Sequence, residues 1–187
     1  INVVETVLID FNDDIVNSLK KVGSKAVSLH TKKDNVIEII PEQKELGFVG
    51  IPNKINTETI FEKLKNNMIP IISPLGLGEN EQTYNINGDH AAGAVAKSLK
   101  SRRLLLMTNV EGVLNREKKL ISEINSSKII KMIEDKTITE GMIPKINTCL
   151  DAVKNDVTAV GIIDGRKPRS VLFELFSDKG SGTLIRK

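Results

Sequence analysis

The second half of the chain alternates regularly between short apolar runs and segments with helical spacing of apolar residues. The apolar runs at 69–75, 103–108 and 159–164 are continuous, which is typical of strands buried on both faces of a parallel sheet. Helices are expected between and after these runs, at 89–100, 126–135, 144–155 and 169–176, followed by a last short strand at 183–185. Such alternation with short connections predicts an α/β fold, a three-layer αβα sandwich built on a mostly parallel, doubly wound sheet.

The first half has a less regular pattern that predicts a mixture of helices and short strands. The expected elements are helices at 2–9 and 15–23, strands at 25–29, 36–40 and 46–50, and a helix that Asn56 or Thr57 caps and that carries Ile60, Leu64 and Met68. Gly23 would end the second helix, and the strands at 25–29 and 36–40 could pair across the turn at 32–35. We see no internal repeat and no linker, so residues 1–187 are expected to form a single domain.

Composition argues against nucleic acid and membrane partners. The net charge of +3 is mild and the lysines are scattered along the chain. Aromatic residues make up only 3% of the chain and Trp is absent, which argues against a nucleic-acid site built by base stacking. No apolar run approaches the roughly eighteen residues that a membrane span needs.

The single cysteine and the first residue bear on cellular context. Cys149 lies among apolar positions of a predicted helix, so we expect no internal disulfide and a buried thiol in a reducing, cytoplasmic compartment. The chain begins at Ile1 rather than Met, already inside a helical pattern, and is expected to be a segment of a longer protein. His30 and His90 lie far apart without Cys or carboxylate partners at ligand spacing, so no metal site is predicted.

Polar residues gather where the run at 69–75 is followed by the next helix. Asn85 and Asn87 occupy alternate positions, so in extended backbone their amides would point the same way. Asp89 is expected at the N-cap of the following helix, which is rich in Ala and Gly and would allow close approach of a ligand. A simple cap and tight packing of the helix on the sheet remain the alternatives.

Two further segments could contact an anion. Residues 108–114 leave the carboxyl end of a predicted buried strand, the edge at which α/β sheets bind ligands, although a bare connection would look the same. Lys145 follows Pro144 at a predicted helix start, where a cation is unfavourable unless a bound phosphate neutralises it. A solvated surface lysine is the alternative. The glycines at 180–183 predict a tight turn more strongly than an anion site.

Six segments, in this order and spacing, resemble the amino acid kinase family, and within it the members that phosphorylate N-acetyl-L-glutamate in arginine biosynthesis. The matching segments are 69–76, 84–89, 105–114, 141–145, 163–166 and 172–183. The likeness runs through nearly the whole chain.

The resemblance implies that ATP, with Mg²⁺ bridging its phosphates, phosphorylates the side-chain carboxylate of N-acetyl-L-glutamate. Lys145 would stabilise the transferring phosphoryl group, Asp89 would organise the catalytic lysines, and Asn85 would bind the substrate with Asn87 beside it. The residues that would hold ATP are Asn109, Val110, Glu111, Gly112, Val113, Leu114, Thr137, Ile138, Thr139 and Met142. In such a reaction the protein mostly positions two anions and neutralises the charge between them.

The resemblance also implies an organisation and partners. Residues 1–75 would belong to the substrate-binding and dimer-forming half, and 76–187 to the nucleotide-binding half. Glu174 and Gly180 match positions that bind an arginine effector in arginine-sensitive members, and the family forms homodimers and hexamers.

This sequence departs from the family pattern in several places. The family's N-terminal portion, which carries a catalytic lysine, a glycine-rich loop and a substrate-binding arginine, has no counterpart here, so these 187 residues are not expected to catalyse alone. Gly88 stands where Ala is usual, and Asn109 where Asp is usual, which removes a charge near the nucleotide. Arg169 replaces a common histidine, which weakens the expectation of arginine control.

The residues leave two alternatives to this activity open. The protein could phosphorylate another acid, such as an aminoadipate derivative or aspartate. It could also be a non-catalytic module that binds nucleotide or arginine, its chemistry lost with the missing portion and with Asn109.

Overall fold

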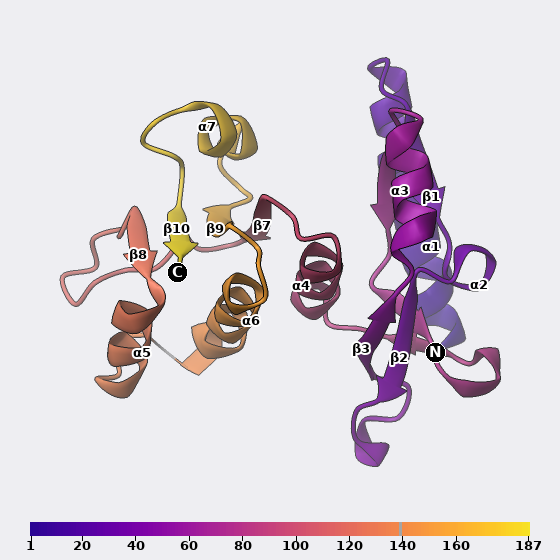
Figure 1. The fold of residues 1–187 in the computed structure, drawn as a ribbon, viewed down its shortest axis with the longest axis horizontal. Helices are drawn as coiled ribbons and strands as arrows, with labels where there is room; N and C mark the ends of the chain where they lie inside the picture. Colours follow the sequence, from indigo (N-terminus) through magenta and orange to yellow (C-terminus); the bar gives the residue numbers. More distant parts are fainter. Residues whose placement is uncertain (139) are drawn as a thin grey trace. The chain divides into compact units, whose positions relative to one another are not determined.

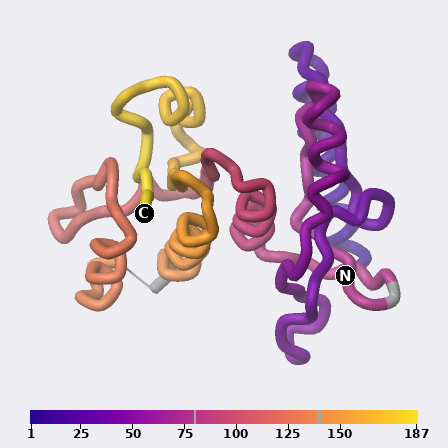
Figure 2. The backbone as a smooth tube through the Cα atoms, viewed as in Figure 1, coloured from indigo at the N-terminus to yellow at the C-terminus, as the bar shows by residue number. Residues whose placement is uncertain are grey.

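The computed structural model describes residues 1–138 and 140–187, apart from the side chains of Asn80 and Glu140 (Figures 1 and 2). It divides into two compact units, residues 1–95 and 96–187. We describe each unit by itself. None of the helices in the described residues is both long enough and apolar enough to cross a membrane.

Unit one, residues 1–95, contains two sheets and the helices that accompany them. Its elements are α1 (Asn2–Lys21), β1 (Ala26–Leu29), α2 (Thr31–Asp34), β2 (Ile37–Pro41), η1 (Lys44–Leu46), β3 (Gly50–Ile55), α3 (Thr57–Lys65), β4 (Ile69–Ile72), β5 (Leu75–Leu77), η2 (Glu79–Glu81), β6 (Thr83–Asn85) and most of α4 (Gly88–Ser98). Strands β1 and β4 form a parallel pair, and a four-stranded sheet has the order β3-β2-β5-β6.

The structure corrects several sequence-based predictions in unit one. The helices predicted at 2–9 and 15–23 are one continuous helix, α1, because the residues between them include no helix breaker. Gly23 ends it as expected, with φ +86° and its N–H donated to the carbonyl of Lys20. The strand predicted at 46–50 is wrong, since a 3₁₀ turn occupies Lys44–Leu46 and the strand runs over Gly50–Ile55.

Pairing of strands in unit one also differs from expectation. The segments predicted to pair across residues 32–35 belong to different sheets, because that turn is the short helix α2. The apolar run at 69–75 is divided into β4 and β5 at Ser73 and Pro74, where proline's missing N–H interrupts the ladder. The predicted cap at Asn56 is confirmed, because its side chain accepts from the N–H of Thr59 at 3.4 Å.

Unit two, residues 96–187, has one four-stranded sheet with the order β7-β9-β10-β8. Its elements are β7 (Arg103–Thr108), β8 (Glu123–Asn125), α5 (Ser126–Glu134), η3 (Glu140–Met142), α6 (Ile143–Lys154), β9 (Ala159–Asp164), α7 (Ser170–Phe176) and β10 (Thr183–Arg186). Strands β7 and β9 are parallel, β9 and β10 antiparallel, and β10 and β8 parallel. These boundaries confirm most of the predicted elements, but β8 was not anticipated.

The core of unit two lies around β9, whose six residues are all buried. Helix α6 contributes Ile146, Cys149 and Val153 to this core at helical spacing. Each large apolar side chain buried in this way contributes about 1.5–3 kcal/mol. Continuous burial of β9 therefore follows from its continuous apolar sequence, and the α/β class expected from that pattern is confirmed.

Candidate functional site

Two neighbouring parallel strands of unit two end side by side. Thr108, the last residue of β7, is the register partner of Asp164, the last residue of β9. The N–H of Gly165 donates to the carbonyl of Thr108 at 2.8 Å, which extends the pairing one residue past β9. The loops that begin at Asn109 and Gly165 therefore leave the sheet at the same carboxyl edge, where α/β sheets place their ligands.

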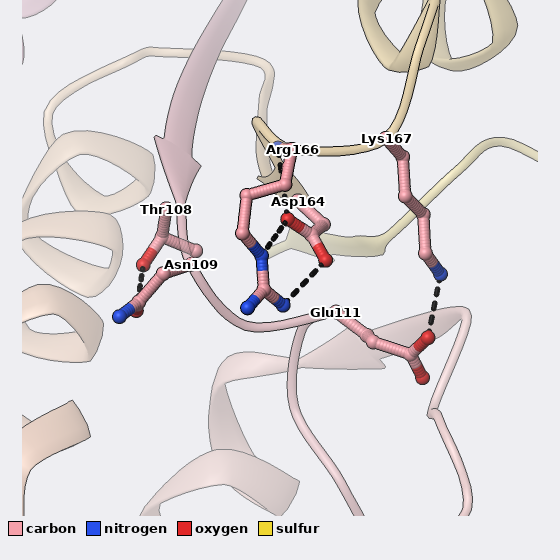
Figure 3. Close-up of polar contacts among 6 residues, drawn as sticks. All are labelled: Thr108, Asn109, Glu111, Asp164, Arg166 and Lys167. Carbon is pink, nitrogen blue, oxygen red and sulfur yellow. Dashed lines mark hydrogen bonds and ion pairs between the residues drawn. The ribbon is translucent and has the colours of Figure 1, made fainter.

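Asp164 and Arg166 form a rigid ion pair at this edge (Figure 3). The Asp164 side chain is only 4% exposed, and both its oxygens accept from the guanidinium of Arg166, through Nε and Nη2 at 2.9 Å each. The backbone N–H of Arg166 donates to the same carboxylate at 3.0 Å. These hydrogen bonds from Arg166 lower the pKa of Asp164 to about 2, so the carboxylate is charged at neutral pH. Fork-to-fork geometry fixes the arginine's direction.

A second ion pair joins the two loops. Lys167 Nζ lies 2.6 Å from a carboxylate oxygen of Glu111, so the turn after β9 is tied to the loop after β7 (Figure 3). Both side chains are about half exposed. Beside them, the hydroxyl of Thr108 donates to the amide oxygen of Asn109 at 3.5 Å, a long hydrogen bond. The loop after β7 is therefore held at Asn109 by Thr108 and at Glu111 by Lys167.

The far end of that loop is held by the last strand. The buried hydroxyl of Thr183 accepts from the N–H of Val113 at 2.8 Å and donates to the carbonyl of Ile121 at 2.7 Å. Gly112 has φ +145°, and a Cβ at this position would lie 2.5 Å from the Thr183 hydroxyl. Only glycine allows the loop to pass this close to β10.

The same loop forms one wall of an apolar cavity of about 160 Å³. Its other wall comes from the segment after α5. The lining residues are Val110, Gly112, Val113, Leu114, Thr137, Ile138 and Met142. All seven are among the residues predicted to hold ATP. The cavity is well below the roughly 300–1,000 Å³ of pockets that enclose a whole ligand, so its size and apolar lining fit one flat ring of a nucleotide.

Polar contacts join the two segments that line this cavity. Arg116 Nη2 lies 2.9 Å from the carboxylate of Asp135, and Arg116 Nε donates to the hydroxyl of Thr137 at 3.2 Å. The Thr137 hydroxyl and N–H both donate to Asp135, which with Arg116 lowers the pKa of that carboxyl. The two cavity walls are thereby joined. Thr139, also predicted to bind nucleotide, lies outside the described residues.

Unit one contains the polar residues predicted to bind the acid substrate. Asn85 ends β6 and is half-buried, and helix α4 begins just after Asn87. The side-chain oxygen of Asn87 accepts from the N–H groups of Asp89 and His90, at 2.9 and 3.3 Å. Asn87 therefore caps α4, and Asp89, predicted as the cap, lies in the first turn. The N-cap position predicted for Asp89 is therefore wrong by two residues.

Lys145 lies in the first turn of α6, directly after Pro144, as the sequence predicted. Its side chain is half-buried rather than fully exposed, which disfavours the simple surface lysine. It belongs to unit two, whereas Asn85 and Asp89 belong to unit one. The joint action of these residues stays a prediction.

The two predicted effector residues line one larger cavity of unit two, about 740 Å³ in volume. Glu174 is 4% exposed, and one of its oxygens accepts from the N–H of Ser181 at 2.8 Å. Arg103 lies beside it, with Nη1 3.9 Å from the carboxylate and 3.0 Å from the Glu174 carbonyl oxygen. Gly180 has φ +65°, and a Cβ there would lie 2.7 Å from Glu174. Charged side chains of both signs surround this cavity.

Sequence reasoning missed the ion pairs that organise these sites. Asp164 and Arg166 entered only as part of a matching segment, and the signal that could have identified them is an Asp-Gly-Arg sequence at the end of a fully apolar strand. Arg116 and Asp135 carried no signal, because ordinary surface charges surround both. The described residues contain no cluster of three or more His, Cys, Asp or Glu side chains that could hold a metal ion.

Comparison with known proteins gives a consistent result. The chain is 54% identical to the acetylglutamate kinase of Pelagibacter ubique, over all of this chain and 65% of that protein. It is 47% identical to the acetylglutamate kinase of Clostridioides difficile, over 94% of this chain and 63% of that protein. The chain thus spans about two thirds of the length of the curated relatives it matches.

Solved structures show the same fold. Smu.665 of Streptococcus mutans is 33% identical with a TM-score of 0.76, covering 91% of this chain and 64% of that one. The carbamate kinase of Giardia shares the fold at 20% identity and a TM-score of 0.67, over 94% of this chain and 68% of its own. The family model described as "Amino acid kinase family" matches residues 5–164. The chain therefore belongs to the amino acid kinase family.

Proposed function

We propose that the protein transfers the γ-phosphoryl group of ATP to the side-chain carboxylate of N-acetyl-L-glutamate, a step of arginine biosynthesis in the cytoplasm. One observation carries the nucleotide half of this proposal. Residues of two separate segments that were predicted to hold ATP line a single ring-sized cavity. The acid half is supported by relatives named acetylglutamate kinase, at up to 54% identity.

In the proposed reaction the base of ATP enters the apolar cavity and its phosphates lie toward the carboxyl edge of β7 and β9. Lys145 places its ammonium against the migrating phosphoryl group, and Asn85 and Asn87 hold the acid through amide hydrogen bonds. Asp89 is the residue proposed to organise the catalytic lysines, of which Lys145 is the one within this chain. Mg²⁺ bound as part of the ATP complex would supply further charge neutralisation. Such an ion would be held largely by the phosphates of the nucleotide and by water.

A coupled assay tests the proposal on the complete gene product that carries these residues. N-acetyl-L-glutamate, L-glutamate, L-aspartate and 2-aminoadipate are offered with MgATP, and only the first should be turned over at an appreciable rate. Preferred turnover of another acid would replace the assignment with a different acid kinase. ATP binding without turnover of any acid would favour the non-catalytic module.

The role of Lys145 is tested by Lys145→Ala in the same protein. Turnover should fall about 100-fold or more while acetylglutamate binding stays nearly unchanged, because charge stabilisation acts in the transition state. Lys154→Ala, at the other end of the same helix, is the matched control and should keep full turnover. Loss of acetylglutamate affinity at unchanged turnover would contradict this role.

Arginine control is a second candidate function, supported by the charged cavity around Glu174 and Gly180. A buried carboxylate beside a cavity of about 740 Å³ suits a guanidinium ligand. Titration of turnover with L-arginine, with L-lysine as the control cation, tests it. Equal effects of the two amino acids would contradict a specific site.

Self-association is the remaining part of the proposal. Helix α1 exposes Val3, Val7 and Phe11, which recur at four-residue spacing and so form one apolar stripe. We expect a homodimer or a hexamer, and light scattering gives the mass directly. A monomer that keeps full turnover would contradict the dimer.

A further inference from the structure

The guanidinium of Arg166 is fixed in direction by groups that leave part of it exposed. Asp164 takes up its Nε and one Nη2 hydrogen, and Asp164 itself is buried at the end of β9. The Arg166 side chain is nevertheless 66% exposed. Its remaining N–H groups, including both on Nη1, are therefore held in place by the pair without being used in it.

The guanidinium of Arg166 lies next to the loop after β7, which lines the ring-sized cavity. Figure 3 shows Arg166 extending from the turn after β9 toward the start of that loop, near Asn109 and Glu111. The carboxylate of Glu111 contributes to raising the pKa of Arg166, after the larger effect of Asp164, which places Glu111 within electrostatic range. Lys167 neutralises Glu111 at 2.6 Å, so the acidic group does not cancel the cation beside it.

A ligand in the cavity would extend past this cation. The cavity wall includes Val110 and Gly112, one residue to either side of Glu111. A base seated there leaves its sugar and phosphates to continue along the carboxyl edge of β7 and β9. At this edge the side chain of Asn109, the first residue after β7, is neutral. The exposed N–H groups of Arg166 are therefore a cationic donor set beside the path of an anionic chain.

We propose that Arg166, oriented by the buried carboxylate of Asp164, binds a phosphate group of the nucleotide. This inference rests on the proposed function, because it takes ATP as the phosphoryl donor. A substrate carboxylate would offer similar chemistry. Phosphate is favoured because Arg166 shares its unit with the predicted nucleotide cavity, whereas the predicted acid-binding amides belong to unit one. Asp164 acts as a positioning residue that makes no contact with the ligand.

The test compares the affinities of ATP, ADP and adenosine for the complete gene product by calorimetry. Arg166→Gln should weaken ATP and ADP binding by roughly 10- to 100-fold, the effect of losing charge-assisted hydrogen bonds, and leave adenosine unchanged. Lys167→Gln removes the same charge one residue away and is the matched control. It should change ATP affinity by less than about threefold, since Lys167 is already paired with Glu111.

A double variant keeps the test valid if Arg166→Gln does not fold, because a buried Asp164 without its partner is destabilising. Asp164→Asn/Arg166→Gln removes both charges and should fold, with the same loss of ATP and ADP affinity. ATP affinity equal to wild type in this variant would overturn the proposal. Equal losses for adenosine and ATP, or an equal loss in Lys167→Gln, would overturn it as well.

Two further measurements separate this inference from the proposed function. Acetylglutamate affinity is measured for each variant, and its loss in place of ATP affinity would assign Arg166 to the acid instead. A wild-type protein that binds ATP and responds to Arg166→Gln but phosphorylates a different acid would sustain the inference and refute the proposed function. A wild-type protein that binds neither ATP nor ADP would refute both.

Discussion

Two buried carboxylates of the same unit, Asp164 and Glu174, each lie beside an arginine, and they are held in opposite ways. At Asp164 the arginine makes the hydrogen bonds, two at 2.9 Å, and presents its remaining N–H groups outward. At Glu174 the backbone N–H of Ser181 makes the short contact, while the guanidinium of Arg103 is 3.9 Å from the carboxylate. At Asp164 the exposed group is therefore the guanidinium of Arg166. At Glu174 the carboxylate itself lines a cavity of about 740 Å³.

This difference follows from sequence distance. Arg166 is two residues from Asp164, so the turn after β9 brings the pair together and their chain entropy cost is small. Arg103 is 71 residues from Glu174, and β7 must be in place before the two can meet. The Asp164–Arg166 pair therefore forms with the turn itself, whereas the contact of Arg103 with Glu174 forms only once the sheet is assembled.

The glycines beside the two carboxylates give the largest expected contrast. Gly180→Ala places a Cβ 2.7 Å from Glu174 in left-handed backbone and should cost about 2–3 kcal/mol of unfolding free energy. Gly165→Ala has ordinary contacts, at 3.4 Å from Met107, and should cost less than about 1 kcal/mol. Urea denaturation of both variants measures the difference. Equal costs would mean that the turn at Gly180 adjusts freely and that Glu174 is not rigidly held.

Removal of each arginine tests which one holds its carboxylate. Arg103→Gln should cost about 1 kcal/mol, because Glu174 keeps its hydrogen bond from Ser181. Arg166→Gln should lower Tm by more than Arg103→Gln does, because it removes both hydrogen bonds that the Arg166 side chain donates to Asp164. Thermal unfolding at one protein concentration compares them. A larger loss of Tm in Arg103→Gln than in Arg166→Gln would show that Glu174, and not Asp164, depends more on its arginine.

The stability that the Asp164 carboxylate contributes should be lost over a narrow range of acidic pH. Because the pKa of Asp164 falls from its ordinary value near 4 to about 2, its stabilising effect is complete above about pH 4 and is lost as pH decreases toward 2. Asp164→Asn should therefore show a flatter dependence of Tm on pH between about 2 and 4. An unchanged slope would show that Arg166 does not hold the charged carboxylate.

The smallest expected effect belongs to the exposed pair of Lys167 and Glu111. Lys167→Gln should cost roughly 0.2–1 kcal/mol, and added salt should reduce the difference from wild type, as for other surface ion pairs. Urea denaturation at low and high ionic strength measures it. A cost as large as that of Arg166→Gln would show that the Lys167–Glu111 pair stabilises the fold as much as the Asp164–Arg166 pair does, which would contradict this prediction.

The sequence predicted the fold best where apolar runs were long. Strand β9 and helix α6 agree with expectation within a residue, because burial on every side leaves a continuous or strictly periodic pattern. Strands β6 and β8, with three residues each, were missed, since so short a segment has no period to read. The split at Ser73 and Pro74 was missed because the apolar residues continue across it.

The site was predicted in part. Seven of the residues that the family resemblance assigns to ATP line one cavity, and their binding of ATP stays a prediction. The capping of α4 by Asn87 in place of Asp89 depended on where the helix begins, and helix starts shift by a residue or two without changing the apolar pattern. The Arg116 contact depends on a tertiary arrangement that residue spacing alone does not encode.

The hydroxyl of Thr183 helps to hold one wall of the apolar cavity in place. Thr183 lies some seventy residues after the loop that it fastens, yet it bonds directly to Val113 in the cavity wall. Strand β10 lies between β9 and β8 in the sheet, so this hydroxyl ties the cavity wall to an interior strand. The shape of this cavity is therefore set by the register of the sheet as well as by the loop that lines it.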